Sequence, residues 1–275
     1  MLFLAVGGDI LNKKARMTKA PVYYVLAQAK FNPIAAMGDK YVNDIQDRLR
    51  QAGYTLFEQQ NIAQIQLGNP EVCPISQVSQ WLVSKENMTS GFILTASSLM
   101  YHTTHYETSE EFIPEFLRGL QIVHDVVSLD HISRLGLRYL DAVVPSSHET
   151  VRQYLVNGLH GVDFKAEQEY TLTESVFKTN SGPLLSNGKL VARVLQLASS
   201  LLVYPADLLP QKLVPMKRFE FKEPCAHAVI DTDHFVEGHM PVDFDKIKAQ
   251  LVSLHAINKE AFESAVSAHA KKIWA

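Results

Sequence analysis

The sequence has little cysteine and no excess of charge of either sign. Its 275 residues include two cysteines, Cys73 and Cys225, and carry a formal net charge of −3. Two cysteines without a metal-binding or redox spacing argue against a disulfide scaffold and indicate a reducing, cytoplasmic compartment. The mixed charge argues against a nonspecific nucleic-acid binder, because attraction to phosphates requires a basic surface.

Long hydrophobic runs are also absent. No run approaches the roughly 20 apolar residues that cross a bilayer, so we expect no membrane-spanning helix. Residues 1–8 are apolar, but the nearest basic residues follow this run, which is the wrong order for a secretory signal. We therefore expect residues 1–16 to be a dispensable extension and residues 17–275 to form one domain.

What the sequence does contain is a repeated order of strand and helix patterns, with 47% hydrophobic residues to build a core. The order β-α-β-β-β-α occurs twice, in residues of about 17–128 and 129–275. It predicts an α+β fold with a largely antiparallel sheet in two similar halves, long helices packed on one side, and a C-terminal helical segment. Predicted strands cover residues 21–31, 54–67, 80–88, 91–106, 132–144, 165–178, 189–204 and 217–236. Predicted helices cover residues 39–52, 109–127, 146–158 and 243–275, the last with a break near 257–258.

Residues 132–144 are apolar on both faces and predict a central strand that nevertheless carries charge. Alternation places Arg134 and Arg138 on one face, with Gly136 between them, and Tyr139 and Asp141 on the other. An arginine in such a strand needs a carboxylate, backbone carbonyls or a ligand anion, because an unpaired interior charge is costly. If another segment covers this face, the arginines are structural ion pairs; if the face is open, they are available to a ligand.

Three other residues are candidates for a site. Asp231 and Asp233 fall on one face of a predicted strand, an arrangement that can hold a divalent cation for phosphoryl transfer. The two carboxylates can equally be the counter-ions of the arginines, and no glycine-rich nucleotide loop accompanies them. Tyr101 can stack on a ligand ring, although aromatic residues at a strand end commonly pack in the core.

Residues 134–141, Arg-Leu-Gly-Leu-Arg-Tyr-Leu-Asp, resemble the R-x-G-L-R-Y-hydrophobic-N signature of a sporadically distributed, functionally uncharacterised bacterial family of similar length. Residues 20–25 resemble its first strand, and residues 254–274 resemble its terminal L-H…I-N…F…W helix. Asp141 departs from the pattern, which usually has asparagine there. The resemblance implies the fold and its boundaries but no reaction, and a patchy distribution implies mobile or defence-type gene neighbourhoods.

Two functions are compatible with these features. The first is a non-enzymatic binding or adaptor protein, without a cofactor, that recognises a protein partner or a small anionic ligand through Arg134, Arg138, Asp141 and Tyr101. It follows from the lack of a complete catalytic motif: no Gly-x-Ser-x-Gly elbow or catalytic-cysteine signature is present. The alternative is a metal-dependent enzyme acting on phosphates or nucleotides, with Mg²⁺ or Mn²⁺ held by Asp231 and Asp233. We expect a protein partner or a homo-oligomer, and neither a membrane nor a nucleic acid.

Overall fold

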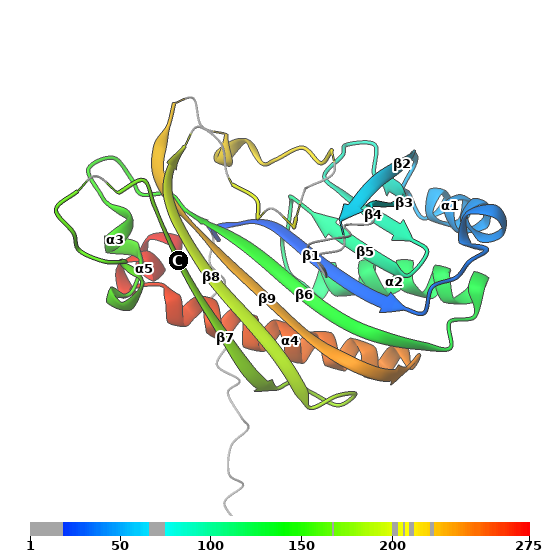
Figure 1. The fold of residues 1–275 in the computed structure, drawn as a ribbon. Helices are drawn as coiled ribbons and strands as arrows, with labels where there is room; N and C mark the ends of the chain where they lie inside the picture. Colours follow the sequence, from blue (N-terminus) through cyan, green and yellow to red (C-terminus); the bar gives the residue numbers. More distant parts are fainter. Residues whose placement is uncertain are drawn as a thin grey trace, which may run out of the picture.

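One antiparallel sheet of nine strands organises the part of the chain that the computed structural model describes (Figure 1). This part comprises residues 19–65, 75–166, 168–199, 203–205, 207–208, 212–220 and 223–275. The strands are β1 (Val22–Phe31), β2 (Leu56–Ile65), β3 (Ile75–Ser84), β4 (Ser90–Thr95), β5 (Ser98–Thr103), β6 (His131–Val143), β7 (Tyr170–Asn180), β8 (Asn187–Ser199) and β9 (Cys225–Pro241). The helices are α1 (Val42–Gln51), α2 (Ser109–Val127), α3 (Val151–Tyr154), α4 (Phe244–Ala265) and α5 (Ala268–Trp274). The predicted α+β class is confirmed.

The strand order is β2-β3-β4-β5-β1-β6-β9-β8-β7. In each half of the chain the first strand pairs with the last one, β1 with β5 and β6 with β9, and the remaining strands extend outward from that pair. The two first strands, β1 and β6, pair with each other at the centre. Both halves thus share one pairing scheme, although four strands (β5, β4, β3 and β2) extend from β1 and three (β9, β8 and β7) extend from β6. The proposed division into equivalent halves stays a prediction, and residues 1–16 lie outside the described residues.

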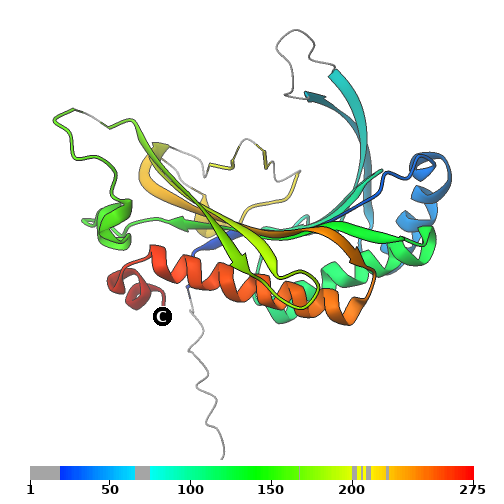
Figure 2. The same ribbon diagram turned by 60° about the horizontal axis from the view of Figure 1, so that its bottom comes forward.

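The helices lie on one face of the curved sheet (Figure 2). The long helices α2 and α4 pack there side by side, α2 against β1 and β5 and α4 against β6 and β9. Their apolar stripes, represented by Leu120 of α2 and Leu254 of α4, are fully buried against the sheet residues Leu137 and Val236. Helix α2 comes close to the sheet at Gly119, where an added Cβ would clash with the ring of Phe92.

A segment between β8 and β9 crosses the opposite, concave face of the sheet (Figure 2). It comprises the described residues of 203–220. Leu208 and Phe219 from this segment form a small buried cluster with Tyr23, Tyr24 and Leu140 of the central strands. The hydroxyl of Tyr23 donates a hydrogen bond to the Val203 carbonyl oxygen at 2.6 Å. The central strands are therefore covered on both faces, which explains why the sequence of β6 is apolar on both.

Two predicted boundaries at helices were wrong. The break expected near residues 257–258 is absent, because α4 continues to Ala265 and the chain turns at Val266 before Ser267 caps α5. Asn258 has the residue type of a helix cap, but it lies inside α4 and its side chain bonds to the sheet. The helix expected over 146–158 is reduced to α3, which begins after Thr150 with a Thr150–Gln153 capping box.

Several predicted strands were also wrong in extent: β3 begins at Ile75 and ends at Ser84 where 80–88 was expected, and β7 begins at Tyr170 where 165 was expected. The strand expected over 91–106 is two strands, β4 and β5, joined by a tight turn in which the hydroxyls of Thr95 and Ser98 share a hydrogen bond of 2.8 Å. The strand expected over 217–236 begins at Cys225 and runs to Pro241, and Lys217–Phe219 is a single 3-10 turn. In the last of these regions the buried Phe219 of the 3-10 turn has the residue type of a strand residue.

Candidate functional site

Arg138 lies in the middle of β6 on the concave face and is 5% exposed. Its Nε and Nη2 donate to the two carboxylate oxygens of Asp231 at 2.7 and 2.8 Å. Its Nη1 and Nη2 donate to Asp207, in the segment between β8 and β9, at 2.7 and 3.2 Å. Arg193 of β8 adds a second cation 3.3 Å from Asp231. The guanidinium therefore has four of its five N–H groups engaged by two carboxylates.

These contacts keep Arg138 charged although it is buried. Burial alone would lower the pKa of Arg138, but its hydrogen bonds to Asp231 and Asp207 outweigh burial and hold the pKa above its ordinary value. The same bonds hold the pKa of Asp207 below its ordinary value. Asp231 is thus placed as the counter-ion of Arg138, one of the two roles open to it from the sequence.

Arg134 has a looser environment at the rim of the same face. It donates to the side-chain oxygen of Gln28 at 2.7 Å, and carboxylate oxygens of Asp233 and Glu237 lie 3.4 Å away. Its guanidinium also lies over the ring of Phe235, 4.0 Å from the centroid. Burial raises the pKa of Asp233 above its ordinary value, and Arg134 offsets only part of this. Asp233 is therefore less firmly paired than Asp231.

The described residues contain no group of three or more His, Cys, Asp or Glu side chains placed to hold a metal ion. At the pair expected to bind Mg²⁺ or Mn²⁺, both oxygens of Asp231 accept hydrogen bonds from Arg138. A cation at Asp231 and Asp233 would have to displace this guanidinium.

We therefore expect neither Mg²⁺ nor Mn²⁺ to raise the melting temperature, since only a ligand that binds the folded state stabilises it. Thermal unfolding with each cation, and with EDTA as the reference, measures this. A rise in melting temperature that Asp233→Asn abolishes would contradict the expectation and support the metal-dependent enzyme.

Asp141 lies on the opposite, helix-covered face of β6, in the wall of a cavity of about 810 Å³. The cavity is bounded by the starts of β1 and α2, by β6 and β9, by α4, by the C-terminal residues, and by Met216 and Arg218 of the segment between β8 and β9. Asp141 is 7% exposed, and no hydrogen bond or ion pair joins its carboxyl group to any side chain that the structure describes. Burial raises its pKa to about 8. A lone buried carboxyl that faces a cavity is typical of a functional site.

Two more polar groups of this cavity have no partner. Thr232 of β9 and Asn258 of α4 are almost fully buried, and neither the Thr232 Oγ1 nor the Asn258 Oδ1 has a hydrogen bond within the described chain. The orientation of the Asn258 amide is fixed, because its Nδ2 donates to the carbonyl oxygen of Leu137 at 2.9 Å. A buried polar atom without a partner is uncommon in folded proteins, and a bound ligand is one explanation for it.

An aromatic and imidazole wall completes the cavity. The hydroxyl of Tyr139 and the Nδ1 of His255 share a hydrogen bond of 2.9 Å. The ring of Tyr106 meets that of Tyr139 edge to face, with centroids 5.5 Å apart. Burial lowers the pKa of His255, with a further contribution from Lys259, so the imidazole is neutral near pH 7. These rings line the cavity that Asn258 and Thr232 also line.

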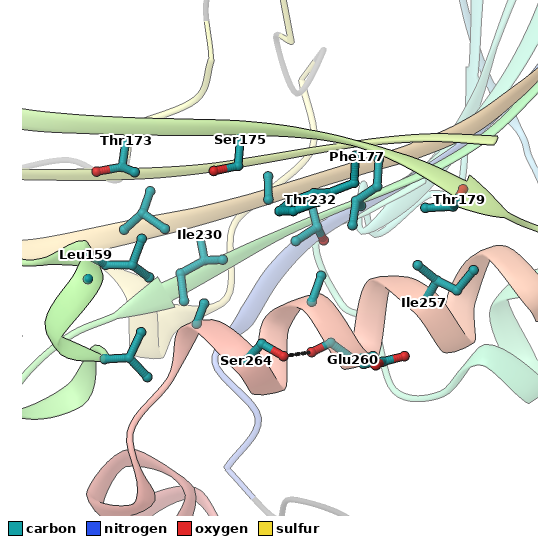
Figure 3. A pocket seen from close by; sticks show the side chains of 17 residues that line it. Leu159, Thr173, Ser175, Phe177, Thr179, Ile230, Thr232, Ile257, Glu260 and Ser264 are labelled. Atoms are coloured by element: carbon teal, nitrogen blue, oxygen red, sulfur yellow. Dashed lines mark hydrogen bonds between the residues drawn. The ribbon is translucent and has the colours of Figure 1, made fainter.

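A second hollow, of about 570 Å³, lies on the other side of α4, beneath β7 and β8 (Figure 3). Its walls are mainly apolar and include Phe177 of β7, Ile230 of β9 and Ile257 of α4. Thr232 lines both this groove and the Asp141 cavity. None of the described residues that line this groove is a buried charged residue, so its chemistry differs from that of the cavity.

The structure separates the residues singled out in the sequence. Arg134, Arg138, Asp231 and Asp233 meet on the concave face, whereas Asp141 faces the helices. Tyr101 belongs to neither site, because its ring is buried between Phe92 and Phe112 in the core.

The residues that sequence reasoning did not place in the site are Thr232, His255 and Asn258. His255, Asn258 and Phe262 have the spacing i, i+3, i+7, which puts side chains on one face of a continuous helix. This spacing was the available signal, and the predicted helix break concealed it.

No helix among the described residues is both long and apolar enough to cross a membrane. The sequence matches no family model and no curated protein in the comparisons made. The resemblance to the uncharacterised bacterial family therefore stays a prediction.

Proposed function

We propose that this protein is a binding protein that holds a small organic molecule in the Asp141 cavity. The observation that carries the proposal is the carboxyl group of Asp141, which is buried, faces a large cavity and has no partner in the described chain. The volume of about 810 Å³ is within the range typical of small-molecule sites.

Three buried polar groups in the wall of the cavity support one class of ligand, and the lining also includes acidic and basic side chains such as Glu110 and Lys259. The Asn258 Oδ1 can only accept a hydrogen bond, the ionised Asp141 carboxylate accepts only, and the Thr232 Oγ1 both donates and accepts. A ligand with several N–H donors, such as an ammonium, guanidinium or amino-substituted ring, complements this set. The rings of Tyr106 and Tyr139 supply aromatic contacts that suit a cation or a flat ring.

This ligand class differs from the anion expected at the arginines. Arg138 has four N–H groups engaged by Asp231 and Asp207, and the segment that carries Asp207 lies over it. An anion would have to compete with two carboxylates of the chain itself. The geometry supports a donor-rich ligand at Asp141 better than an anion at the arginines.

Thermal-shift measurements with a panel of primary amines, guanidines and aminopyridines test the proposal, with matched carboxylic acids as the reference set. We expect one or more nitrogen compounds to raise the melting temperature of the parent protein, because a ligand at about 100 times its Kd adds about 2.7 kcal/mol. Asp141→Asn should abolish this rise. Asp163→Asn, which removes an exposed carboxylate from the loop before β7, should leave it unchanged.

Calorimetry in two buffers of different ionisation enthalpy provides a second readout. Since Asp141 is largely protonated at pH 7, a cation that pairs with the carboxylate should release close to one proton on binding. Equal binding to the parent protein and to Asp141→Asn, or stabilisation by the carboxylic acids alone, would reject the proposal.

A further inference from the structure

Strand β7 forms one edge of the sheet and exposes apolar side chains on both faces. Among the strands that the structure describes, none pairs with its outer edge. Phe177 is 51% exposed and lines the groove on the helix side, together with Thr173 and Ser175 (Figure 3). Val176 is 57% exposed and, by alternation, points to the opposite face with Glu174. A long edge strand with exposed apolar residues is a template for pairing with another strand.

The backbone of β7 indicates which residues can pair outward. Ser181, next to the strand end, donates its N–H to the Ser186 carbonyl oxygen across the β7–β8 hairpin. In an antiparallel pair, the N–H and C=O of successive residues point alternately toward and away from the partner. The even-numbered residues 172–180 therefore direct their N–H and C=O groups away from β8.

We propose that β7 pairs antiparallel with β7 of a second copy of this chain, with the two-fold axis at Val176. In this register Val176 faces Val176 of the partner, and Glu174 faces Lys178 of the partner, twice by symmetry. The even residues from 172 to 180 would then form about ten backbone hydrogen bonds across the interface. The result is one continuous sheet through both subunits, an isologous contact that closes on itself.

The charged side chains favour this register over registers shifted by two or four residues. A shift of two residues in one direction leaves Glu174 opposite Val176 of the partner and Lys178 opposite Leu172. A further shift the same way places Glu174 opposite itself, and like charges directly opposite are destabilising. A lysine on an edge strand commonly prevents pairing. Here Lys178 has a carboxylate opposite it in the symmetric register, so it favours a second copy over an unrelated strand.

Pairing would also cover the exposed ring at the groove. Ser175 and Phe177 lie on the helix side of β7, and in the proposed register Phe177 faces Ser175 of the partner. The ring would then be enclosed between its own groove and the neighbouring strand. Glu174 keeps its hydrogen bond from Arg193 of β8, at 2.6 Å, and gains a lysine on its other side.

Native mass spectrometry and light scattering of the full chain over a range of concentrations test the inference. We expect a dimer whose Kd rises about tenfold or more in Lys178→Glu, because two attractive cross-strand pairs become repulsive. Val176→Lys should act in the same direction, since it sets two lysines against each other on the axis. Ile62→Lys, at a half-exposed position on the opposite edge strand β2, is the matched control and should leave the dimer intact.

Mixing two variants distinguishes a charge-paired interface from a folding defect. Glu174→Lys and Lys178→Glu should each weaken self-association, yet an equimolar mixture should form a heterodimer, because every facing pair is then of opposite sign. The double variant Glu174→Lys/Lys178→Glu should recover the homodimer. A parent protein that is monomeric at all concentrations, a dimer that survives Val176→Lys, or a mixture that fails to associate while both variants are folded would overturn the inference.

Discussion

Replacing Arg138 by methionine is expected to lower the free energy of unfolding by about 3–5 kcal/mol, among the largest effects of any single substitution in this protein. The substitution leaves the carboxylate of Asp231, 2% exposed, without the guanidinium that binds both of its oxygens. Arg193 remains 3.3 Å away and compensates only partly. Urea unfolding followed by circular dichroism measures the change.

Two further variants separate the loss of the pair from the loss of side-chain volume. Arg138→Met/Asp231→Leu removes both buried charges and should recover most of the stability, because an apolar pair of similar size often replaces a buried ion pair without cost. Arg134→Met should cost less than Arg138→Met, since Arg134 is more exposed and its carboxylates lie 3.4 Å away. A double variant that is no more stable than Arg138→Met would contradict this expectation. It would show that the carboxylate of Asp231 does not destabilise the protein when Arg138 is replaced.

The part of the fold that follows from local pattern could be predicted. The alternation in residues 132–144 places Leu137 with the helices and Arg138 on the opposite face, as the structure does. Helix α2 has its predicted bounds, because Thr108 caps its first turn and the apolar stripe is uninterrupted. Such features depend on neighbouring residues only, so a single sequence contains them.

The parts that depend on contacts distant in sequence could not be predicted. Asp207 reaches Arg138 from the segment between β8 and β9, 69 residues away in the sequence. Asn258 resembles a helix cap by residue type, but it lies inside α4, where its amide donates to the Leu137 carbonyl oxygen in the sheet. Nothing in the surrounding sequence indicates either contact. The position of the cavity is related to the second contact, because the cavity wall includes residues of α4 on both sides of Asn258.

The two faces of β6 differ in whether their charged side chain has a partner. On the concave face the charge of Arg138 is matched by carboxylates of the chain itself. On the helix face Asp141 is three residues further along the same strand, and it faces a cavity instead of a partner. The sequence signature of residues 134–141, which suggested one ligand site, therefore spans both faces. The helix face, where Asp141 has no partner among the described residues, is the face at which a ligand would add interactions.

Replacing Asp141 by asparagine is expected to change the pH dependence of stability. The pKa of this carboxyl is raised by burial from 3.8 to about 8, so between these values the folded protein holds a proton that the unfolded chain has released. Stability contributed by the neutral carboxyl is complete below about pH 4 and is lost as pH rises to about 8. The slope is at most about 1.4 kcal/mol per pH unit. Asp141→Asn has no such proton, so the variant should become more stable than the parent as pH rises.

Denaturant unfolding at intervals from pH 4 to pH 9 measures this difference, with Asp163→Asn as the control for loss of an exposed carboxylate. Parallel pH profiles for the parent and Asp141→Asn would show that the carboxyl is not buried unpaired in solution. A stabilised Asp141→Asn that has also lost the thermal shift from nitrogen compounds would carry more weight than either result alone. A group that lowers stability at neutral pH and is needed for binding has the trade-off between stability and activity that is typical of a functional residue.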